Sequence, residues 1–91
     1  MKILIFIPAY NVEAKVYSVI SRIPSEIFGK NEINLLIIND FSTDQTLNEI
    51  EKIKKNFNYK IFVHNADKNL GYGGVQKFAF NYSIKNSYDY L

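Results

Sequence analysis

Three short segments of the chain carry the residue types that could do chemistry. Their sequences are PAYN (8–11), NDFSTD (39–44) and HNADKNLGYGG (64–74), and each follows an apolar run. In the second segment, the carboxylate of Asp40 can accept a hydrogen bond from a ring N–H of a base such as uracil or guanine. In the first, Tyr10 offers a flat face on which the same base can stack. These residues therefore indicate a site for a nucleotide base.

The glycine-rich stretch 69–77 raises the question of a phosphate site, because it holds three of the chain's four glycines. It does not match the dinucleotide-binding pattern G-x-G-x-x-G, since Gln76 occupies the third glycine position and the stretch comes late in the chain. The P-loop pattern also fails, because Pro24 stands where the pattern needs a glycine before the Gly29-Lys30 pair. Neither common phosphate-binding motif is present.

Two explanations of these glycines stay open. Glycines that begin a helix leave free N–H groups and the positive end of the helix dipole, which suit a phosphate, and Lys68 and Lys77 could add charge. The alternative is that the glycines only allow a tight turn from a strand into a helix.

Other polar residues in these segments are explained by helix starts. Ser42 or Thr43 can cap the second expected helix, whose first turn Asp44 also suits. Asn11 and Glu13, at the start of the first expected helix, are residues of the kind that cap helices more often than they bind ligands. The one histidine, His64, has no cysteine or second histidine to join it, so it does not predict a metal site.

Alternating strand and helix patterns must position these segments. A continuous apolar run predicts a buried strand at 3–7, mainly apolar segments predict strands at 33–38 and 59–63, and a fourth strand begins at Tyr88. Helical spacing predicts three buried stripes between the strands: Val12, Val16, Val19, Ile20 and Ile23; Leu47, Ile50, Ile53 and Phe57; and Val75, Phe78, Ala79 and Tyr82. Such alternation favours an α/β fold, an open parallel sheet of three to four strands in the order 3-2-1-4 with helices on both faces. The three polar segments then meet at the carboxyl edge of the sheet, where ligands bind in such folds.

Composition limits the classes of function. The 91-residue chain has a formal net charge of +2, too small to indicate a nucleic-acid or membrane-surface partner, and no cysteine for a disulfide or thiolate metal site. Its apolar runs are much shorter than the ~20 residues that span a bilayer, and the apolar start lacks a signal-peptide cleavage site. We therefore expect one small cytoplasmic domain.

The motifs PAYN, NDFSTD and NLGYGG, in this order, resemble those of the family-2 glycosyltransferases, which have the GT-A fold, a Rossmann-like domain that binds nucleotide-sugars. The resemblance covers essentially all 91 residues. The variant NLGYGGVQK is most similar to the polyprenyl-phosphate branch, which includes the dolichyl-phosphate sugar synthases. By this resemblance, residues 1–91 form the nucleotide-sugar-binding half of a glycosyltransferase domain, truncated before the family's D-x-D metal motif.

The resemblance implies that seven residues bind the nucleotide: Pro8, Ala9, Tyr10, Glu13, Asp40, Lys68 and Gly71. In the family, the segment that matches the first three lines the base pocket, and the acid that matches Asp40 bonds the base ring. Glu13 falls on a frequently acidic position near the nucleotide. The residues around Lys68, Asn69 and Gly71 approach the diphosphate or the sugar. Asn39 departs from the pattern, because the family often has a second aspartate there.

The resemblance also implies a UDP- or GDP-linked sugar donor, a polyprenyl-phosphate or glycan acceptor, and a divalent cation, Mg²⁺ or Mn²⁺, in the full-length enzyme. It places the catalytic and metal-binding residues beyond Leu91. We therefore expect this chain alone to bind no metal ion and to transfer no sugar. The full-length protein would act in the cytoplasm, at the inner face of the membrane.

Two other classes are alternatives to a glycosyltransferase. One is a non-catalytic, doubly wound nucleotide-binding or interaction module, and the other is a folded remnant without a ligand. A receiver module needs an acidic pair at the end of its first strand, where this chain has Pro8 and Ala9. A flavodoxin needs a hydroxyl-rich phosphate loop at the same place, and this loop is also missing. An assay of ligand binding separates the remnant from the enzyme.

Overall fold

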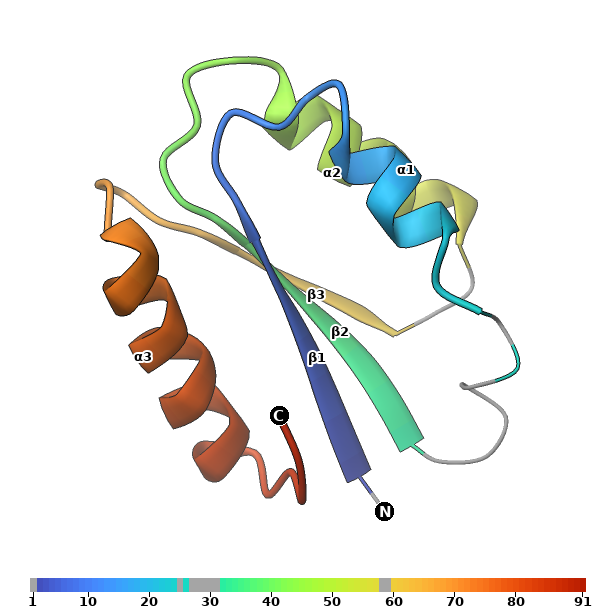
Figure 1. Cartoon of the computed structure of the whole chain (residues 1–91), viewed down its shortest axis with the longest axis vertical. Helices are drawn as coiled ribbons and strands as arrows, with labels where there is room; N and C mark the ends of the chain where they lie inside the picture. The colour runs from blue at the N-terminus through green and yellow to red at the C-terminus, as the bar shows by residue number, and fades with distance from the viewer. Residues whose placement is uncertain (1, 25, 27–31, 58–59) are drawn as a thin grey trace.

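The computed structural model describes residues 2–24, 26, 32–57 and 60–91, in which strands and helices alternate. The elements are β1 (Lys2–Ala9), α1 (Val16–Ser21), β2 (Glu32–Asn39), α2 (Thr46–Asn56), β3 (Ile61–Asn65) and α3 (Gly71–Lys85). The strands pair in parallel in the order β1-β2-β3, so β2 is central (Figure 1). Ile37 of β2 lies opposite Ile7 of β1 and Val63 of β3, which sets the register.

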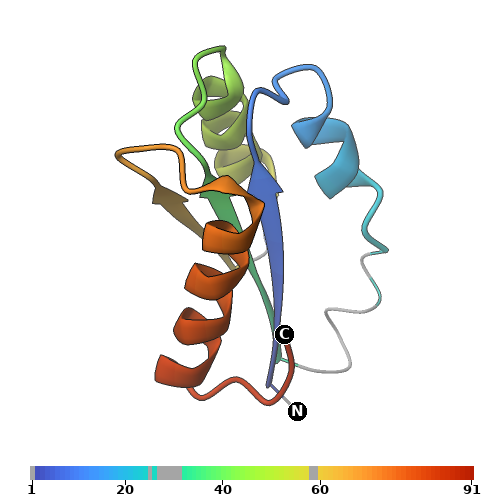
Figure 2. The ribbon, with the colours of Figure 1, turned by 60° about the vertical axis from the view of Figure 1, so that its left-hand side comes forward.

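The helices cover both faces of the sheet, with α1 and α2 on one face and α3 on the other (Figures 1 and 2). Leu35 and Ile37 of β2 belong to the apolar cluster under the first two helices, with Val16, Ile20, Ile50 and Ile53. Leu36 and Ile38 belong to the cluster under α3, with Leu4, Val75 and Ala79. Successive side chains of a strand point to opposite faces, so a strand covered on both faces is continuously apolar. The predicted open parallel sheet with helices on both faces is confirmed.

A short bridge extends the sheet beyond β1. Ile3 pairs in parallel with Tyr90, and the Leu4 N–H donates to the Tyr90 carbonyl over 2.9 Å. The Asp89 N–H donates to the Lys2 carbonyl over 2.7 Å. Because β2 occupies the other edge of β1, this bridge lies where the predicted order 3-2-1-4 places its fourth strand.

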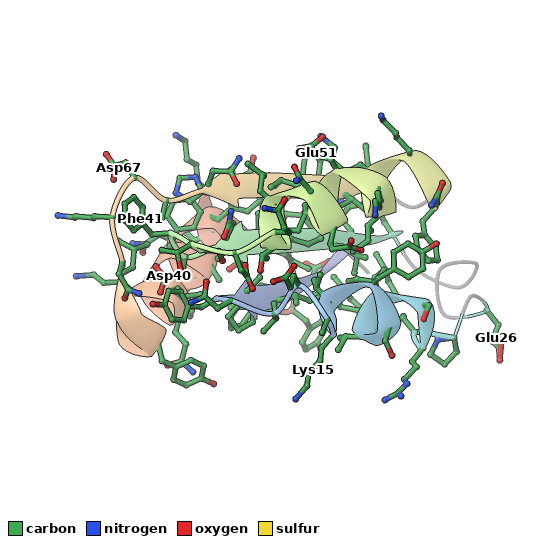
Figure 3. The ribbon with its side chains drawn as sticks, turned by 90° about the horizontal axis from the view of Figure 1, so that it is seen from above. Lys15, Glu26, Asp40, Phe41, Glu51 and Asp67 are labelled. Carbon is green, nitrogen blue, oxygen red and sulfur yellow. The ribbon has the colours of Figure 1, made fainter. Side chains whose placement is uncertain are left out.

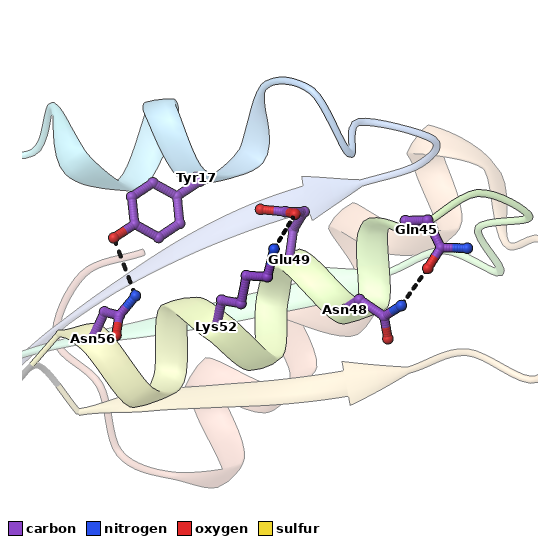
Figure 4. Close-up of polar contacts among 6 residues, drawn as sticks. All are labelled: Tyr17, Gln45, Asn48, Glu49, Lys52 and Asn56. Atoms are coloured by element: carbon purple, nitrogen blue, oxygen red, sulfur yellow. Dashed lines mark hydrogen bonds and ion pairs between the residues drawn. The ribbon is translucent and has the colours of Figure 1, made fainter.

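The two helices on the same face are joined by a hydrogen bond, which Figure 4 shows, and by an aromatic contact. The Tyr17 hydroxyl of α1 accepts a hydrogen bond of 3.3 Å from the side-chain amide of Asn56, and its ring centre lies 5.5 Å from that of Phe57. Along α2 there are two local polar contacts, Glu49–Lys52 at 3.1 Å and Gln45–Asn48. Local pairs of this kind stabilise a helix by only about 0.2–0.5 kcal/mol. They do not join α1 to α2, which also share the apolar cluster that contains Val16, Ile20, Ile50 and Ile53.

The buried stripe of α2 differs from the prediction by one residue. Leu47 was expected to be buried but is 40 % exposed, whereas Thr46 is fully buried. Thr46 shares a helix face with Ile50 and Ile53, and a helix places neighbours at i+4 and i+7 on one side. Its hydroxyl oxygen accepts a hydrogen bond of 2.9 Å from the Val12 N–H, which allows a polar residue to be buried there.

The start of α2 also differs from the prediction. The expected caps, Ser42 and Thr43, do not bond the first turn of the helix. The Asp44 carboxylate instead accepts a hydrogen bond of 2.9 Å from the Thr46 N–H. The reason is that the helix begins at Thr46, two residues later than a cap at Thr43 would need. Ser42 and Thr43 bind the loop after β1, as described below.

The first helix and the third strand are displaced from their expected positions. The expected first stripe begins at Val12, but α1 begins at Val16, because Lys15, directly before it, has a φ of −126° that is not helical. Val19 was expected to be buried and is 47 % exposed, because the six-residue helix turns Val16 and Ile20 toward the sheet. The third strand was expected at 59–63 and is found at Ile61–Asn65, and Tyr59 lies outside the described residues. No helix in the described ranges has the length and apolar character needed to cross a membrane.

Candidate functional site

A pocket of about 440 Å³ opens at the carboxyl edge of the sheet, between the ends of β1 and β2 and the start of α3. Five of the seven predicted nucleotide-binding residues line this pocket: Pro8, Ala9, Tyr10, Asp40 and Gly71. The rest of the lining consists of Val12, Asn69, Tyr72 and Val75. The pocket therefore brings together the three polar segments that the sequence places at this edge.

The other two predicted residues, Glu13 and Lys68, do not line the pocket. Both side chains are exposed. The Glu13 N–H donates to the Asp44 carboxylate over 3.3 Å, so the backbone of Glu13 takes part in packing between loops. A role in nucleotide binding stays a prediction for both residues.

Asp40 joins the tip of β2 to its neighbours on both sides. The residue is only 5 % exposed, and its carboxylate oxygens accept hydrogen bonds from the N–H groups of Leu70, at 2.5 Å, and Gly71, at 3.1 Å. Its own N–H donates to the Ala9 carbonyl over 2.8 Å. A carboxylate at the N-terminus of a helix satisfies free N–H groups and interacts favourably with the helix dipole. Asp40 therefore caps α3, a role that the sequence analysis did not assign to it.

The conformation of the α3 start explains two of its three glycines. Gly71 has a φ of +72°, which residues with a side chain rarely adopt, although a Cβ added there would meet nothing within 4 Å. At Gly74, an added Cβ would lie 2.9 Å from the Leu70 Cβ, closer than real contacts allow. An added Cβ at Gly73 would meet nothing within 4 Å. The tight-turn explanation thus accounts for Gly71 and Gly74, while packing gives no reason for Gly73.

The loops after β1 and β2 are bonded to each other, and we call residues 11–13 together with 42–46 the loop junction. Asn11 is central to it: its N–H donates to the Ser42 hydroxyl over 3.1 Å, and its side-chain oxygen accepts from the Thr43 N–H over 2.8 Å. The Val12 N–H donates to the buried Thr46 hydroxyl over 2.9 Å. Most of the polar residues in NDFSTD therefore have structural partners.

Asp44 is the charged member of the loop junction. Partial desolvation raises the pKa of its carboxyl group, but hydrogen bonds from the Thr46 hydroxyl, at 2.5 Å, and from the N–H groups of Thr46 and Glu13 outweigh this effect. The pKa of Asp44 is consequently held below its ordinary value of 3.8. The ionised form is favoured because it accepts these bonds.

Two exposed aromatic rings line the pocket, and a third lies at the same end of the sheet (Figure 3). Tyr10 is 50 % exposed and Tyr72 is 68 % exposed, and both line it. Phe41, also 50 % exposed, follows Asp40 with a φ of 60° and lies at the same end of the sheet (Figure 3), but it does not line the pocket. The sequence analysis did not single out Tyr72, and the signal that could have found it is an aromatic residue between glycines in NLGYGG.

Two other features do not form part of the candidate site. His64 stacks on Phe78 with ring centres 4.0 Å apart, which gives this lone histidine a packing role. A second cavity of about 440 Å³ lies beside α3 and contains none of the seven predicted residues; it is lined by Phe6, Gly73, Gln76, Lys77, Phe80 and Leu91. Within the described residues, no three His, Cys, Asp or Glu side chains are grouped so that they could hold a metal ion.

Comparison with known proteins places this geometry in a family. The model of glycosyl transferase family 2 matches residues 4–86. Two curated relatives, from Staphylococcus aureus strains Mu50 and MW2, are 33 % identical over 61 residues, which is 67 % of this chain. Both are named poly(ribitol-phosphate) beta-N-acetylglucosaminyltransferase TarS. A crystal structure of S. aureus TarS residues 1–349 has a TM-score of 0.53 and 28 % identity, and the match covers 78 % of this chain and 20 % of that chain.

These relatives define how far the comparison extends. The chain spans 11 % of the length of the curated relatives, so the match concerns a partial GT-A-like domain. The relatives are poly(ribitol-phosphate) enzymes by name, so they support the family and not the polyprenyl-phosphate branch that NLGYGGVQK suggested. Because the family model covers nearly the whole chain and the solved structure shares its fold, the chain belongs to glycosyl transferase family 2.

Proposed function

We propose that this chain binds the nucleoside diphosphate of a UDP- or GDP-linked sugar in the pocket at the strand ends, as the donor-binding half of a glycosyltransferase. The observation that carries the proposal is the lining of that pocket, which gathers Pro8, Ala9, Tyr10, Asp40 and Gly71 from three separate segments. Membership of the family indicates the class of reaction, glycosyl transfer. The pocket is the candidate binding site for the sugar donor.

The base would bind between Tyr10 and Asp40. The exposed Tyr10 ring offers a stacking surface. Each Asp40 oxygen already accepts one backbone N–H, but an ionised carboxylate has about four acceptor sites. One further bond from a base ring N–H is therefore compatible with the bonds that cap α3.

The diphosphate would lie beside the first turn of α3. The positive end of a helix dipole favours an anion at this place. The N–H of Gly71 is already bonded to Asp40 and, over 2.9 Å, to the Asn69 side chain. The exposed Lys68 precedes this turn and is the nearest lysine in sequence that could add positive charge.

The sugar transfer itself is assigned to a longer enzyme that contains this domain. There, an acceptor oxygen attacks the anomeric carbon of the donor and the nucleoside diphosphate leaves. A divalent cation would neutralise the leaving diphosphate, but the pocket has a single carboxylate, Asp40, which does not fit such an ion. We therefore expect the 91-residue chain alone to transfer no sugar.

The relatives' names support a phosphate-containing polymer as the acceptor of the longer enzyme, and we keep polyprenyl phosphate as the second candidate. Both acceptors fit an enzyme that works in the cytoplasm at the inner face of the membrane. The rival function is a non-catalytic nucleotide-binding module. It would use the same pocket, but no longer protein that contains this domain would transfer a sugar.

Titration of the ¹⁵N-labelled chain with UDP and with GDP tests donor binding. We expect saturable shifts of the backbone NMR signals of residues 8–12, 40 and 69–75. Replacing Tyr10 by Ala should weaken binding by about 5- to 100-fold, because stacking of a base on one ring contributes roughly 1–3 kcal/mol. Phe41→Ala is the matched control, since Phe41 has the same 50 % exposure but lies outside the pocket lining. No saturable shift with either nucleotide, or shifts confined to the second cavity, would contradict the proposal.

A further inference from the structure

Two exposed tyrosines line the same pocket from two different elements. Tyr10 follows the last residue of β1, and Tyr72 is the second residue of α3. Tyr10 is 50 % exposed and Tyr72 is 68 % exposed. In the part of the chain that the structure describes, neither ring packs against another aromatic ring and neither hydroxyl group makes a hydrogen bond. No contact within the described residues therefore explains why positions 10 and 72 both carry a large aromatic side chain.

Asp40 connects the positions of these two rings. Its N–H donates to the carbonyl of Ala9, the residue before Tyr10. Its carboxylate accepts from the N–H of Gly71, the residue before Tyr72. One nearly buried residue thus holds the backbone next to each tyrosine, and the separation of the two ring-bearing segments is set by hydrogen bonds.

We propose that Tyr72 and Tyr10 form a two-sided aromatic clamp for the base of the bound nucleotide, and that Asp40 sets its width. This inference rests on the proposed function and adds to it a residue that recognises the ligand, Tyr72. A flat heterocycle between two rings buries both of its faces, and stacking depends little on which base is present. The clamp therefore raises the affinity for any nucleotide that carries a base, and it does not raise the affinity for inorganic diphosphate.

The test compares ligands with and without a base. UDP, GDP and inorganic pyrophosphate are titrated by calorimetry or NMR into the wild-type chain, Tyr72→Ala and Tyr72→Phe. We expect Tyr72→Ala to weaken UDP and GDP by about 5- to 100-fold and to leave pyrophosphate binding unchanged. Tyr72→Phe keeps the ring and should keep the affinity for both nucleotides. Tyr90→Ala, which removes a tyrosine that is 59 % exposed and outside the pocket, is the matched control and should bind as the wild type does.

The outcomes distinguish the clamp from the underlying function. If the wild-type chain binds UDP or GDP and Tyr72→Ala binds equally well, the clamp is wrong and the donor site stands. If Tyr72→Ala weakens pyrophosphate as much as UDP, Tyr72 acts on the phosphates or on the fold, and the clamp is again wrong. If the wild-type chain binds neither nucleotide, both proposals fail together.

Discussion

The loop junction and the start of α3 meet at the same edge of the sheet but are held in different ways. In the junction, the loops after β1 and β2 are joined by several hydrogen bonds spread over Asn11, Val12 and Glu13 on one side and residues 42–46 on the other. The N–H groups of Leu70 and Gly71, in contrast, both donate to Asp40, and Gly71 alone has a second acceptor, the Asn69 side chain. The first region distributes its bonds, and the second concentrates them on one carboxylate.

This difference separates two causes of polarity at a strand edge. The Ser42 and Asp44 side chains accept hydrogen bonds from backbone N–H groups of the neighbouring loop, and the Thr43 hydroxyl donates to the Asn11 side chain of that loop. Tyr10 and Tyr72 have no partner within the described chain and line a cavity. Residues of the first kind should affect stability, and residues of the second kind should affect binding.

The largest effect is expected from Asp40→Ala. This change removes the acceptor of the Leu70 N–H and one of the two acceptors of the Gly71 N–H, which keeps its bond to Asn69. Bonds to a charged group contribute about 1.5–3 kcal/mol each. We expect the free energy of unfolding to fall by about 2–4 kcal/mol, with faster amide hydrogen exchange in the first turn of α3. Urea denaturation measures the first quantity. Asp67→Ala is the control, because Asp67 is an exposed aspartate in the preceding loop (Figure 3). Equal stabilities of the two variants would show that Asp40 does not hold α3.

Thr46→Val should weaken the loop junction by a smaller amount. The substitution keeps the shape of the buried side chain but removes the oxygen that accepts the Val12 N–H and donates to Asp44. One unsatisfied, partly buried N–H costs about 1–3 kcal/mol, to be measured as a lower free energy of unfolding. Thr43→Val is the control, because Thr43 is exposed and the change removes only a long hydroxyl bond of 3.4 Å to Asn11, while the N–H bond to Asn11 survives. A drop for Thr43→Val as large as for Thr46→Val would contradict this account.

Two glycines of the α3 start should respond in opposite directions. Gly71→Ala forces an L-residue to keep a φ of +72°, which costs about 1–2 kcal/mol. Gly73→Ala meets no atom within 4 Å and should stabilise the chain by about 0.5–1 kcal/mol, because alanine favours a helix more than glycine does. Thermal unfolding of the two variants gives the comparison. If both substitutions lower the stability equally, the positive φ at Gly71 does not determine how the chain responds to an added side chain.

The smallest effect is the pH dependence that Asp44 contributes. Because its pKa in the folded chain lies below the ordinary value of 3.8, its ionised form stabilises the fold fully above that value. The contribution is lost as the pH falls from that value through the lower pKa of the folded state. We expect stability to decrease more steeply in this acidic range for the wild type than for Asp44→Asn, which does not titrate. If the wild type and Asp44→Asn give parallel curves of unfolding free energy against pH, Asp44 does not cause the loss of stability in acid.

The central strands and the location of the site could be predicted because they depend on simple patterns. The apolar runs 3–7, with isoleucine, leucine and one phenylalanine, and 35–38, with leucine and isoleucine, are sufficient to identify β1 and β2, and the carboxyl edge then follows from parallel pairing. The helix starts could not be predicted in the same way. Leu47 and Thr46 differ by one position on α2, and only the hydrogen bonds of Thr46 decide which of them is buried.

Asp40 shows why the candidate site was only partly predictable. Its place at a strand tip predicts an acceptor for a base N–H, which stays a prediction, and the structure shows it accepting backbone N–H groups of this chain instead. The identity of the donors could not be derived, because Leu70 and Gly71 lie about thirty residues further along the chain and approach only when α3 crosses the sheet. Tyr72 was missed for the same reason, since its position at the same pocket as Tyr10 depends on that crossing.

Because β2 contributes side chains to the apolar clusters on both faces of the sheet, it also fixes the position of Asp40 in the pocket. Its odd-numbered residues Leu35 and Ile37 belong to one apolar cluster, and its even-numbered residues Leu36 and Ile38 belong to the other. A slip of this strand by one residue would exchange the two sets and carry Asp40 away from both the Ala9 carbonyl and the α3 start. Both clusters therefore act against the slip at once, and the depth of Asp40 in the pocket is fixed by the packing of the sheet rather than by the loops that surround it.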